Sequence, residues 1–589
     1  MGFRFGGFRL DPDGTLRLDG TPVPLPAPEL AGLRLLLERQ GQVVTRLELK
    51  QAIWGDEPAP ADSVSKCLTS LRKRLEPAKC IQTVYRRGYR FCMKARPFGG
   101  APSAPLPRLA ILPFANSFGI PEYLGPAVAQ EVGDRLAAAQ PAAVSVLARE
   151  SVFALASRGL APRRIGETLQ ADLVLTGSLH LVSSCYRLHA EMIRVEDGGP
   201  IWLEDRLVDR SQLAGLEAEL VNLVTFRISG SPAGEAESAA RIARGDWSIA
   251  AAAEAAEEQL PQRREAYELF VRARYEWQSL ERHRMQDALQ SLLQVAALDP
   301  GLIAARVSLA HLCVAQAYYG FLPPAVAADF VHRAAEPVSD LPARAEAILP
   351  ALGWVNLHFD RNLPAALWWL ARSGHLPHDP WITRARTLVA LSRHRFGEAA
   401  DLLQAAIRVD PWSAWLQARL AWTHHLGGNA ALSVELARRA LERFPEHEGT
   451  RFFGAIIFAW NGEAGQAVDL AHGLAQRLPY LDPAAAVHAY ALAMAGRGRE
   501  ARAILDRLEW LGRERYVMNT FAPAVYAALG EHEAALAGLR AAADSRCPWF
   551  FQMLADPRLK LLAERPEFQS MLGILTGMEA DAERDPMEE

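Results

Sequence analysis

Four prolines in the second half of the chain recur at a fixed interval, which constrains the fold more than any other feature of the sequence. Pro377, Pro411, Pro445 and Pro479 each stand 34 residues after the previous one. The segments between them are rich in alanine and carry amphipathic helical patterns. A fixed period of this length predicts stacked helical repeats, because a single pair of helices cannot bury its apolar face without a neighbour.

The segment that follows each proline repeats the same order of small and large residues. Three examples are Phe396–Leu403, Asn429–Leu436 and Gly462–Leu470, which lie at similar distances after their prolines. This period and pattern resemble the tetratricopeptide (TPR) repeat. The resemblance predicts a TPR-like α-solenoid over residues 263–575. An acidic tail follows over residues 576–589, and the excess of carboxylates from Met578 onward predicts disorder there.

The 589 residues are too many for one hydrophobic core, and two breaks in composition divide the chain. Residues 97–107 read PFGGAPSAPLP, which predicts a linker without regular structure. Residues 230–262 are rich in Ser and Gly and then in Ala and Glu, which predicts a second linker or a poorly packed helix. The breaks separate residues 1–96, 108–229 and 263–575.

Residues 108–229 alternate between strand and helix patterns, which predicts a small α/β domain with an antiparallel end. The adjacent carboxylates Glu204 and Asp205 do not suggest a catalytic pair, because neighbouring side chains on a strand point to opposite faces. Four motifs resemble the TolB-amino-terminal-like segment of bacterial regulators: LAILPF (109–114), YLGPAVAQEV (123–132), ADLVLTGSL (171–179) and PIWLEDRLVD (200–209). The resemblance implies a signal-input or assembly role.

Positive charge is concentrated at the start of the chain. Residues 1–96 contain 17 Lys and Arg against 10 Asp and Glu, a net charge of +7, whereas the whole chain has −4 and the remainder therefore −11. Five of the six lysines lie in the first 94 residues. A basic segment of this size predicts a surface that attracts nucleic acid.

The same 96 residues are predicted to form a compact α+β unit. Short alternating apolar segments come first, and Thr45 with Glu48 makes a capping box that begins a helix. Three helices are expected over residues 29–40, 45–54 and 62–75, and a β-hairpin with a basic tip over residues 81–91.

The third of these helices has two chemically different sides. At about 100° per residue, an apolar stripe contains Val64, Leu68, Leu71 and Leu75, with Cys67 at its edge. The other side is basic and hydroxylated, with Ser63, Lys66, Thr69, Ser70 and Lys73 and, on its flanks, Arg72 and Arg74. Such a helix suits the major groove of DNA, where short polar side chains and lysine reach base edges and arginines contact phosphates. A merely solvated basic helix is the alternative interpretation.

Five motifs in this segment resemble the OmpR/PhoB-type winged-helix DNA-binding domain over residues 2–93. They are Phe5–Asp11, Glu38–Arg46, Ala52–Gly55, Leu71–Glu76 and Gln82–Phe91. The resemblance implies that the third helix reads the major groove and that the hairpin, the wing, enters the minor groove. It places Ser63, Lys66, Thr69 and Ser70 at base-reading positions, Arg72 and Lys73 at phosphates, Arg86 and Arg87 at the wing tip, and Arg74 and Thr83 in the same DNA-binding set. Relatives often carry arginine pairs where this helix has Thr69 and Ser70, so their DNA sequence preference is not transferred.

Motifs of enzymes and of metal sites are absent from the sequence. No lysine lies between Lys94 and Lys560, which excludes a P-loop, a Schiff-base lysine and a phospho-receiver domain there. The six cysteines form no CxxC pair, which fits a reducing compartment. We therefore expect no enzyme activity, no cofactor and no metal. No apolar stretch is long enough for a membrane span and no export signal precedes the fold, so a cytoplasmic location is expected.

The whole arrangement, multidomain and mostly α, resembles one-component regulators of the HilA/CadC-like kind. It predicts a sequence-specific transcriptional regulator without a receiver domain, whose C-terminal regions sense an effector or a protein partner. Expected partners are double-stranded DNA, RNA polymerase or another protein, and a second copy of the chain, with no membrane. The alternative is a TPR interaction scaffold whose basic segment binds DNA only nonspecifically.

Overall fold

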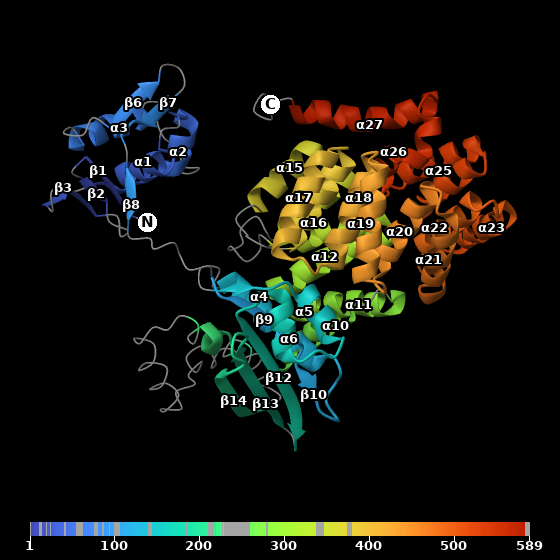
Figure 1. Cartoon of the computed structure of the whole chain (residues 1–589), viewed down its shortest axis with the longest axis horizontal. Helices are drawn as coiled ribbons and strands as arrows, with labels where there is room; N and C mark the ends of the chain where they lie inside the picture. The colour runs from blue at the N-terminus through green and yellow to red at the C-terminus, as the bar shows by residue number, and fades with distance from the viewer. Residues whose placement is uncertain are drawn as a thin grey trace. The chain divides into compact units, whose positions relative to one another are not determined.

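The computed structural model folds into two compact units, the head (Met1–Leu106) and the second unit (Pro107–Glu589) (Figure 1). No helix among its described residues is both long and apolar enough to cross a membrane. The structure describes residues 2–6, 8–10, 15–18, 21–23, 25–40, 43–54, 63–75, 80–84, 88–93, 95–98, 106–139, 144–183, 185–209, 217, 220–225, 228, 260–277, 281–336, 347–373 and 380–583.

The head consists of two small sheets and three helices around one core. The first sheet has the order β4-β3-β2-β1-β8 and contains β1 (Gly2–Phe5), β2 (Phe8–Leu10), β3 (Leu16–Leu18), β4 (Thr21–Val23) and β8 (Arg96–Phe98). The helices are α1 (Ala27–Glu38), α2 (Arg46–Trp54) and α3 (Ser63–Arg74), and the second sheet contains β5 (Val43–Val44), β7 (Gly88–Phe91) and β6 (Ile81–Val84). Phe5 packs edge-on against Phe91, with ring centroids 5.2 Å apart, and so joins the two sheets. The predicted α+β unit with three helices and a hairpin is confirmed.

The linker predicted over residues 97–107 is wrong at its start. Pro97 and Phe98 belong to β8, which pairs antiparallel with β1 so that Phe3 lies opposite Pro97. Because β8 is the edge strand of this sheet, the proline can lie in it without breaking a ladder on both sides. Local composition therefore gave no indication of this pairing across more than 90 residues.

The second unit begins with a mixed sheet of order β11-β9-β12-β13-β14, with β10 beside β12. Its parallel part contains β9 (Arg108–Ile111), β10 (Ala115–Asn116) and β11 (Ser145–Val146), and its antiparallel part the long strands β12 (Leu173–Val182), β13 (Cys185–Arg194) and β14 (Pro200–Asp209). The helices between the strands are α4 (Leu124–Ala139), α5 (Arg149–Ala156) and α6 (Pro162–Leu169). The predicted α/β segment with an antiparallel end is what the structure contains.

A helical array follows this sheet. Its first helices are α10 (Leu260–Glu276), α11 (Arg282–Leu298), α12 (Ile303–Tyr319), α13 (Pro324–Ala335), α14 (Leu349–Val355), which continues as a π-helix over Asn356–Asp360, and α15 (Leu363–Arg372). Then come α16 (Pro380–Ser392), α17 (Phe396–Val409), α18 (Ala414–Leu426), α19 (Ala430–Arg443), α20 (Glu448–Trp460), α21 (Ala464–Arg477), α22 (Asp482–Met494) and α23 (Gly498–Glu514). The last are α24 (Ala522–Ala528), α25 (His532–Asp544), α26 (Phe550–Leu554), a 3₁₀ turn over Pro557–Leu562 and α27 (Pro566–Glu583). Because α10 begins at Leu260, regular structure starts inside the linker predicted over 230–262, most of which lies outside the described residues.

The 34-residue period of the prolines recurs in the helices themselves. The helices α17, α19, α21, α23 and α25 begin at residues 396, 430, 464, 498 and 532, and α16, α18, α20 and α22 at 380, 414, 448 and 482. Between the two helices of a pair, His394, Gly428, Gly462, Gly496 and Gly530 have positive φ, again 34 residues apart. Glycine adopts this conformation without strain, which suits the tight turn of each repeat. The TPR-like array is thus confirmed.

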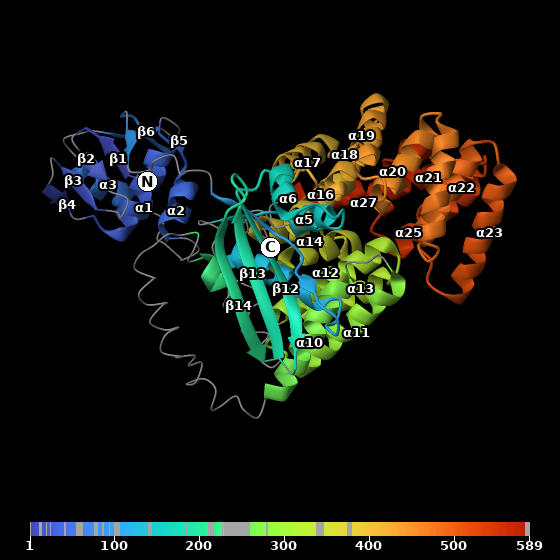
Figure 2. The same ribbon diagram turned by 60° about the horizontal axis from the view of Figure 1, so that its bottom comes forward.

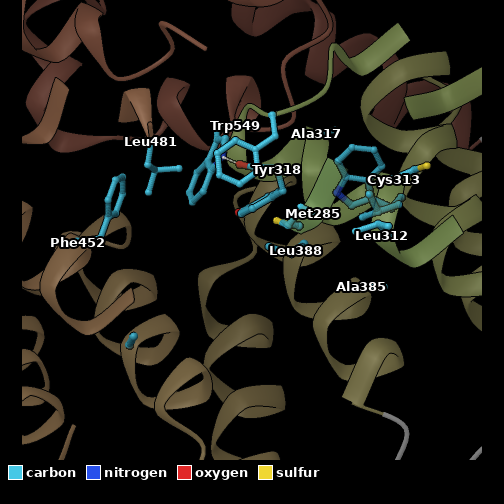
Figure 3. Close-up of a cluster of buried hydrophobic side chains, with 14 of the residues drawn as sticks. Met285, Leu312, Cys313, Ala317, Tyr318, Ala385, Leu388, Phe452, Leu481 and Trp549 are labelled. Atoms are coloured by element: carbon cyan, nitrogen blue, oxygen red, sulfur yellow. Dashed lines mark hydrogen bonds between the residues drawn. The ribbon is translucent and has the colours of Figure 1, made fainter. Parts of the chain in front are cut away.

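The array curls so that early and late helices touch. Tyr318 of α12 packs against Trp549, with ring centroids 4.3 Å apart, and the Trp549 indole donates a hydrogen bond of 2.9 Å to the carbonyl of Tyr318 (Figure 3). The α/β segment also joins this body, since α4 packs against α10 and Arg274 bridges to Glu131 at 2.5 Å. One core cluster therefore extends from the sheet through the array.

The disorder predicted for the acidic tail from Met578 onward is wrong up to Glu583, where α27 ends beside α15 (Figure 1). Met578 is buried in the core. The carboxylate of Glu579 accepts two hydrogen bonds from Arg393, of 2.6 and 2.8 Å. These long-range contacts stabilise a helix that its acidic composition disfavours. Residues 584–589 lie outside the described residues.

Candidate nucleic-acid interface

Helix α3 is anchored in the head by its apolar side. Val64, Cys67, Leu68 and Leu71 are buried, and Leu75 just after the helix is buried too. Burial raises the pKa of the Cys67 thiol to about 11, so this side chain is a neutral core residue. The predicted apolar stripe is confirmed, and it leaves the opposite side of α3 facing outward.

Three predicted DNA-binding residues form a stripe on that outward side. Lys66, Thr69 and Lys73 are all exposed and follow one another at helical spacing, and we call them the α3 stripe. The hydroxyl of Thr69 donates to the carbonyl of Ser65 at 2.7 Å, so its methyl group and its lone pairs are what it offers a partner. Ser63, at the N-terminal end of the helix, is half-buried. The stripe presents two positive charges and a hydroxyl group on one exposed side of the helix, the chemistry that contacts DNA phosphates and base edges.

Ser70 is less available than the sequence suggests. Its hydroxyl donates to the carboxylate of Glu29 at 2.7 Å, and Glu29 also forms an ion pair with Arg74 at 2.7 Å. Glu29 belongs to α1 and is only 7 % exposed. Ser70 and Arg74 therefore hold α3 on α1, so Ser70 contributes to the packing of the head. Their role at DNA stays a prediction.

Arg72 and Thr83, two further predicted contacts, are bonded to each other. Arg72 donates to the Thr83 hydroxyl at 2.7 Å and to the Ile81 carbonyl at 3.2 Å, and its guanidinium lies 5.5 Å from the centroid of the Tyr89 ring. These contacts tie α3 to both wing strands. The pair therefore sets the angle between the helix and the wing, while direct contact with phosphate stays a prediction.

The wing is held against the rest of the head by a close approach at Gly88. Its φ is +139°, and a Cβ at this position would lie 2.1 Å from the carbonyl oxygen of Val44. β5 can therefore pair with β7 only because residue 88 is glycine. Arg86 and Arg87, the predicted wing tip, lie outside the described residues.

The capping box predicted for α2 is present in full. The backbone N–H of Thr45 donates to Glu48 at 2.7 Å, and the N–H of Glu48 donates to the Thr45 hydroxyl at 3.2 Å. The hydrogen bonds that the Thr45 N–H and the Thr45 hydroxyl donate to the Glu48 carboxylate lower the pKa of Glu48. Beside this helix start, Arg46 reaches the Ser65 hydroxyl at 3.4 Å. The start of α2 is thereby fixed close to the start of α3.

Sequence reasoning missed Glu29. It stands in the first turn of α1, 41 residues before Ser70, and no local motif connects the two. The one available indication was its charge, an acid in a strongly basic segment. Among the described residues of the whole chain, no group of three or more His, Cys, Asp and Glu side chains is placed to hold a metal ion.

One family model, described as "Transcriptional regulatory protein, C terminal", matches residues 20–91. The match spans β4, all three helices of the head and both wing strands, which are the elements that carry the α3 stripe. The head carries an OmpR/PhoB-type DNA-binding domain. The matched residues are about an eighth of the chain, and the second unit lies outside the match.

Curated relatives match only part of this chain. The transcriptional regulator HilA of Salmonella typhimurium is 39 % identical over 119 residues, which are 19 % of this chain and 21 % of HilA. A Rhizobium meliloti protein, which bears the provisional name adenylate cyclase 3, is also similar. It is 27 % identical over 214 residues, which are 35 % of this chain and 33 % of that protein. The chain thus spans about a fifth to a third of the length of these relatives.

Three solved structures are also similar. The DNA-binding domain of Klebsiella pneumoniae RstA, in complex with the RstA box, is 28 % identical and covers 15 % of this chain and 96 % of its own, with a TM-score of 0.15. A tetratricopeptide repeat protein of Parabacteroides merdae is 14 % identical and covers 46 % of this chain and 98 % of its own (TM-score 0.30). The TPR domain of P58(IPK) is 14 % identical and covers 56 % of this chain and 92 % of its own (TM-score 0.16).

Proposed function

We propose that this chain is a one-component transcriptional regulator, in which the OmpR/PhoB-type domain binds specific double-stranded DNA and the second unit receives the input. The observation that carries the proposal is the α3 stripe. Lys66 and Lys73 stand exposed on the helix that this domain type presents to DNA, while the other side of the helix is buried. HilA, a relative over 19 % of this chain, is itself named a transcriptional regulator.

The proposal assigns reading and anchoring to different residues. Lys66 and Thr69, in the middle of α3, are the candidates for base edges, since lysine and threonine can contact bases in the major groove. Lys73, near the C-terminal end, is the candidate for a phosphate. Arg72, bonded to Thr83, and Arg74, bonded to Glu29, support the shape of the surface.

The input is proposed to enter through the second unit. A TPR-like array offers a large surface for a protein, and the α/β segment is part of the same compact body. An effector or partner that changed this body would act on the head through the chain that connects them. RNA polymerase as a partner, a cytoplasmic location and the absence of enzyme activity are predictions that accompany this proposal.

A competition binding experiment tests the proposal. The full chain is titrated against DNA from upstream of its own coding sequence, in the presence of excess nonspecific DNA. A sequence-specific regulator is expected to remain bound to a defined site on this DNA despite the excess of nonspecific DNA. Equal displacement by every DNA would instead support the scaffold alternative, in which the basic surface binds phosphates without reading sequence.

A further inference from the structure

The sheet of the second unit ends in a long strand whose outer edge pairs with no other described strand. β14 is the last strand in the order β11-β9-β12-β13-β14, and among the described strands it pairs only with β13 (Figure 2). It is ten residues long, which exceeds the usual five or six. Along its outer edge no other described strand pairs with β14, and an edge strand of this length can accept a further strand.

One face of β14 is apolar on either side of a charge. Leu203 and Leu207 keep 56 % and 55 % of their surface exposed, which is high for leucine in a strand. Asp205 lies between them on the same face and pairs with Arg187 of the neighbouring β13 at 3.6 Å. This face of the edge strand is therefore apolar, acidic and apolar in order.

The other face of β14 has apolar side chains toward its ends and two charged side chains between them. Trp202 and Val208 are buried in the core, and between them Glu204 and Arg206 form an ion pair at 2.9 Å. Charged side chains that point inward at an edge strand normally prevent pairing with foreign strands. Here the two charges have opposite signs, so a partner strand with the reverse order of charges would pair with both of them.

We propose that β14 pairs with β14 of a second copy of this chain, antiparallel and centred on Asp205. Opposite residues then have numbers that add to 410, so Leu203 faces Leu207 of the second copy on the open face. On the inner face Glu204 faces Arg206 of the second copy, and both contacts occur twice because of the two-fold symmetry. Apolar and opposite-charge cross-strand pairs are the contacts that stabilise sheets.

Neighbouring registers are excluded by the same residues. A pairing centred on Glu204 sets Leu203 opposite Asp205 and Trp202 opposite Arg206. A pairing centred on Arg206 sets Asp205 opposite Leu207 and Glu204 opposite Val208. Each places charges against apolar side chains in the middle of the strand, whereas the register centred on Asp205 does so only where Ile201 stands opposite Asp209 at the strand ends.

The chosen register has two unfavourable placements, Asp205 opposite its own copy in the middle of the strand and Ile201 opposite Asp209 at its ends. Each of the two Asp205 carboxylates already pairs with Arg187 of its own chain, which reduces the repulsion between them.

Two paired strands bury less surface than the roughly 1,200–2,000 Å² of a standard stable interface. The dimer is therefore reversible and depends on concentration, and it brings two DNA-binding heads together, so that binding to neighbouring DNA sites is strengthened by effective concentration.

Sedimentation velocity of the full chain over a concentration series tests this pairing. The wild type is expected to shift from monomer to dimer below about 100 μM, the range of a weak interface. Glu204→Arg and Arg206→Glu each set like charges opposite one another twice, so each is expected to weaken the dimer by about tenfold or more. The double variant E204R/R206E restores opposite charges and is expected to return to within about threefold of the wild type. A wild type that stays monomeric, or a double variant that does not recover, would overturn the proposal.

Two further variants keep the test independent of folding defects. Asp205→Asn removes the one repulsive contact and is expected to tighten the dimer, an effect that a damaged fold does not produce. In a chain with Cys92 and Cys185 replaced by Ser, Asp205→Cys is expected to form a disulfide between copies on oxidation, because directly opposite residues on antiparallel strands are close enough. Leu207→Cys is the matched control, since residue 207 faces residue 203 and is not close to its own copy. Equal cross-linking at both positions, or a weaker Asp205→Asn dimer, counts against the register.

Discussion

The head carries its decisive charges on the surface of one helix, whereas the second unit buries several of its charges among helices. Lys66 and Lys73 of the head are exposed. In the second unit Asp556 and Arg558 form an ion pair of 2.7 Å with side chains that are almost fully buried. Surface charge contributes little to folding stability but acts at long range on an anionic partner, and buried charge does the reverse. The comparison teaches that loss of charge should affect DNA binding in one unit and folding in the other.

The largest effect is expected from breaking the buried pair of the second unit. Asp556→Asn leaves the Arg558 guanidinium inside the protein without its carboxylate, and removal of one partner of a buried pair costs about 3–5 kcal/mol of unfolding free energy. Urea denaturation measures this loss, and the DNA affinity of the head should stay unchanged below the transition. Glu500→Gln is the matched control, because its pair with Arg497 is exposed, and it should leave the denaturation midpoint in place. A stable Asp556→Asn protein would show that the buried pair is not needed for folding.

The next largest effect is expected from a lower pH, which should reduce the stability of the second unit more than that of the head. The head contains no histidine, whereas His311 and His358 of the second unit are buried and burial lowers the pKa of each to about 3. Their stability contribution is fully present above the unfolded pKa of 6.5 and decreases as the pH falls below it. At pH 5.5 each costs about 1.4 kcal/mol, so these two histidines together should destabilise the second unit by about 3 kcal/mol relative to pH 7.5. The lowered pKa of His394, His425 and His447 adds to this loss, and Glu217, whose pKa burial raises to about 8, opposes it.

Thermal denaturation of residues 1–106 and of residues 107–589 at the two pH values measures the difference. Each fragment contains its own core cluster, which supports separate folding. The melting temperature of residues 107–589 should fall and that of residues 1–106 should change little. Equal shifts in both fragments would mean that the histidines do not cause the pH dependence.

A smaller effect is expected inside the head, where one predicted DNA contact also supports the fold. Ser70→Ala removes the hydrogen bond to buried Glu29 and should cost about 1–2 kcal/mol, since Glu29 then keeps only its other partners. Thr69→Ala, one residue earlier and exposed, should change stability by no more than about 0.5 kcal/mol. Chemical denaturation of residues 1–106 compares the two variants. An unchanged Ser70→Ala fragment would return Ser70 to the set of purely DNA-facing residues.

The sequence predicts local features of both units better than it predicts contacts between segments that are distant in the chain. Features with a local cause were predicted correctly, such as the capping box of Thr45 and Glu48, the apolar stripe of α3 and the 34-residue period. Contacts between distant segments were not, because no local pattern encodes them. Examples are Glu29 with Ser70, the strand at Pro97 and the helix held by Glu579. For the candidate site, the residue types on α3 were predicted, but not that Arg72, Ser70 and Arg74 are engaged within the head.

The most direct test of the central claim, that DNA binds to the α3 stripe, is the salt dependence of DNA binding by three lysine variants of the full chain. Lys66→Ala should cost about 1–3 kcal/mol on the preferred DNA and little on other DNA, because a base contact is lost. Lys73→Ala should weaken binding to both DNAs and reduce the slope of log affinity against log salt by about 1, because a phosphate contact is lost. Lys560→Ala removes the same charge from an exposed position in the second unit and should change neither quantity. Equal losses for Lys560→Ala and Lys73→Ala, or wild-type binding by both α3 variants, would contradict the claim.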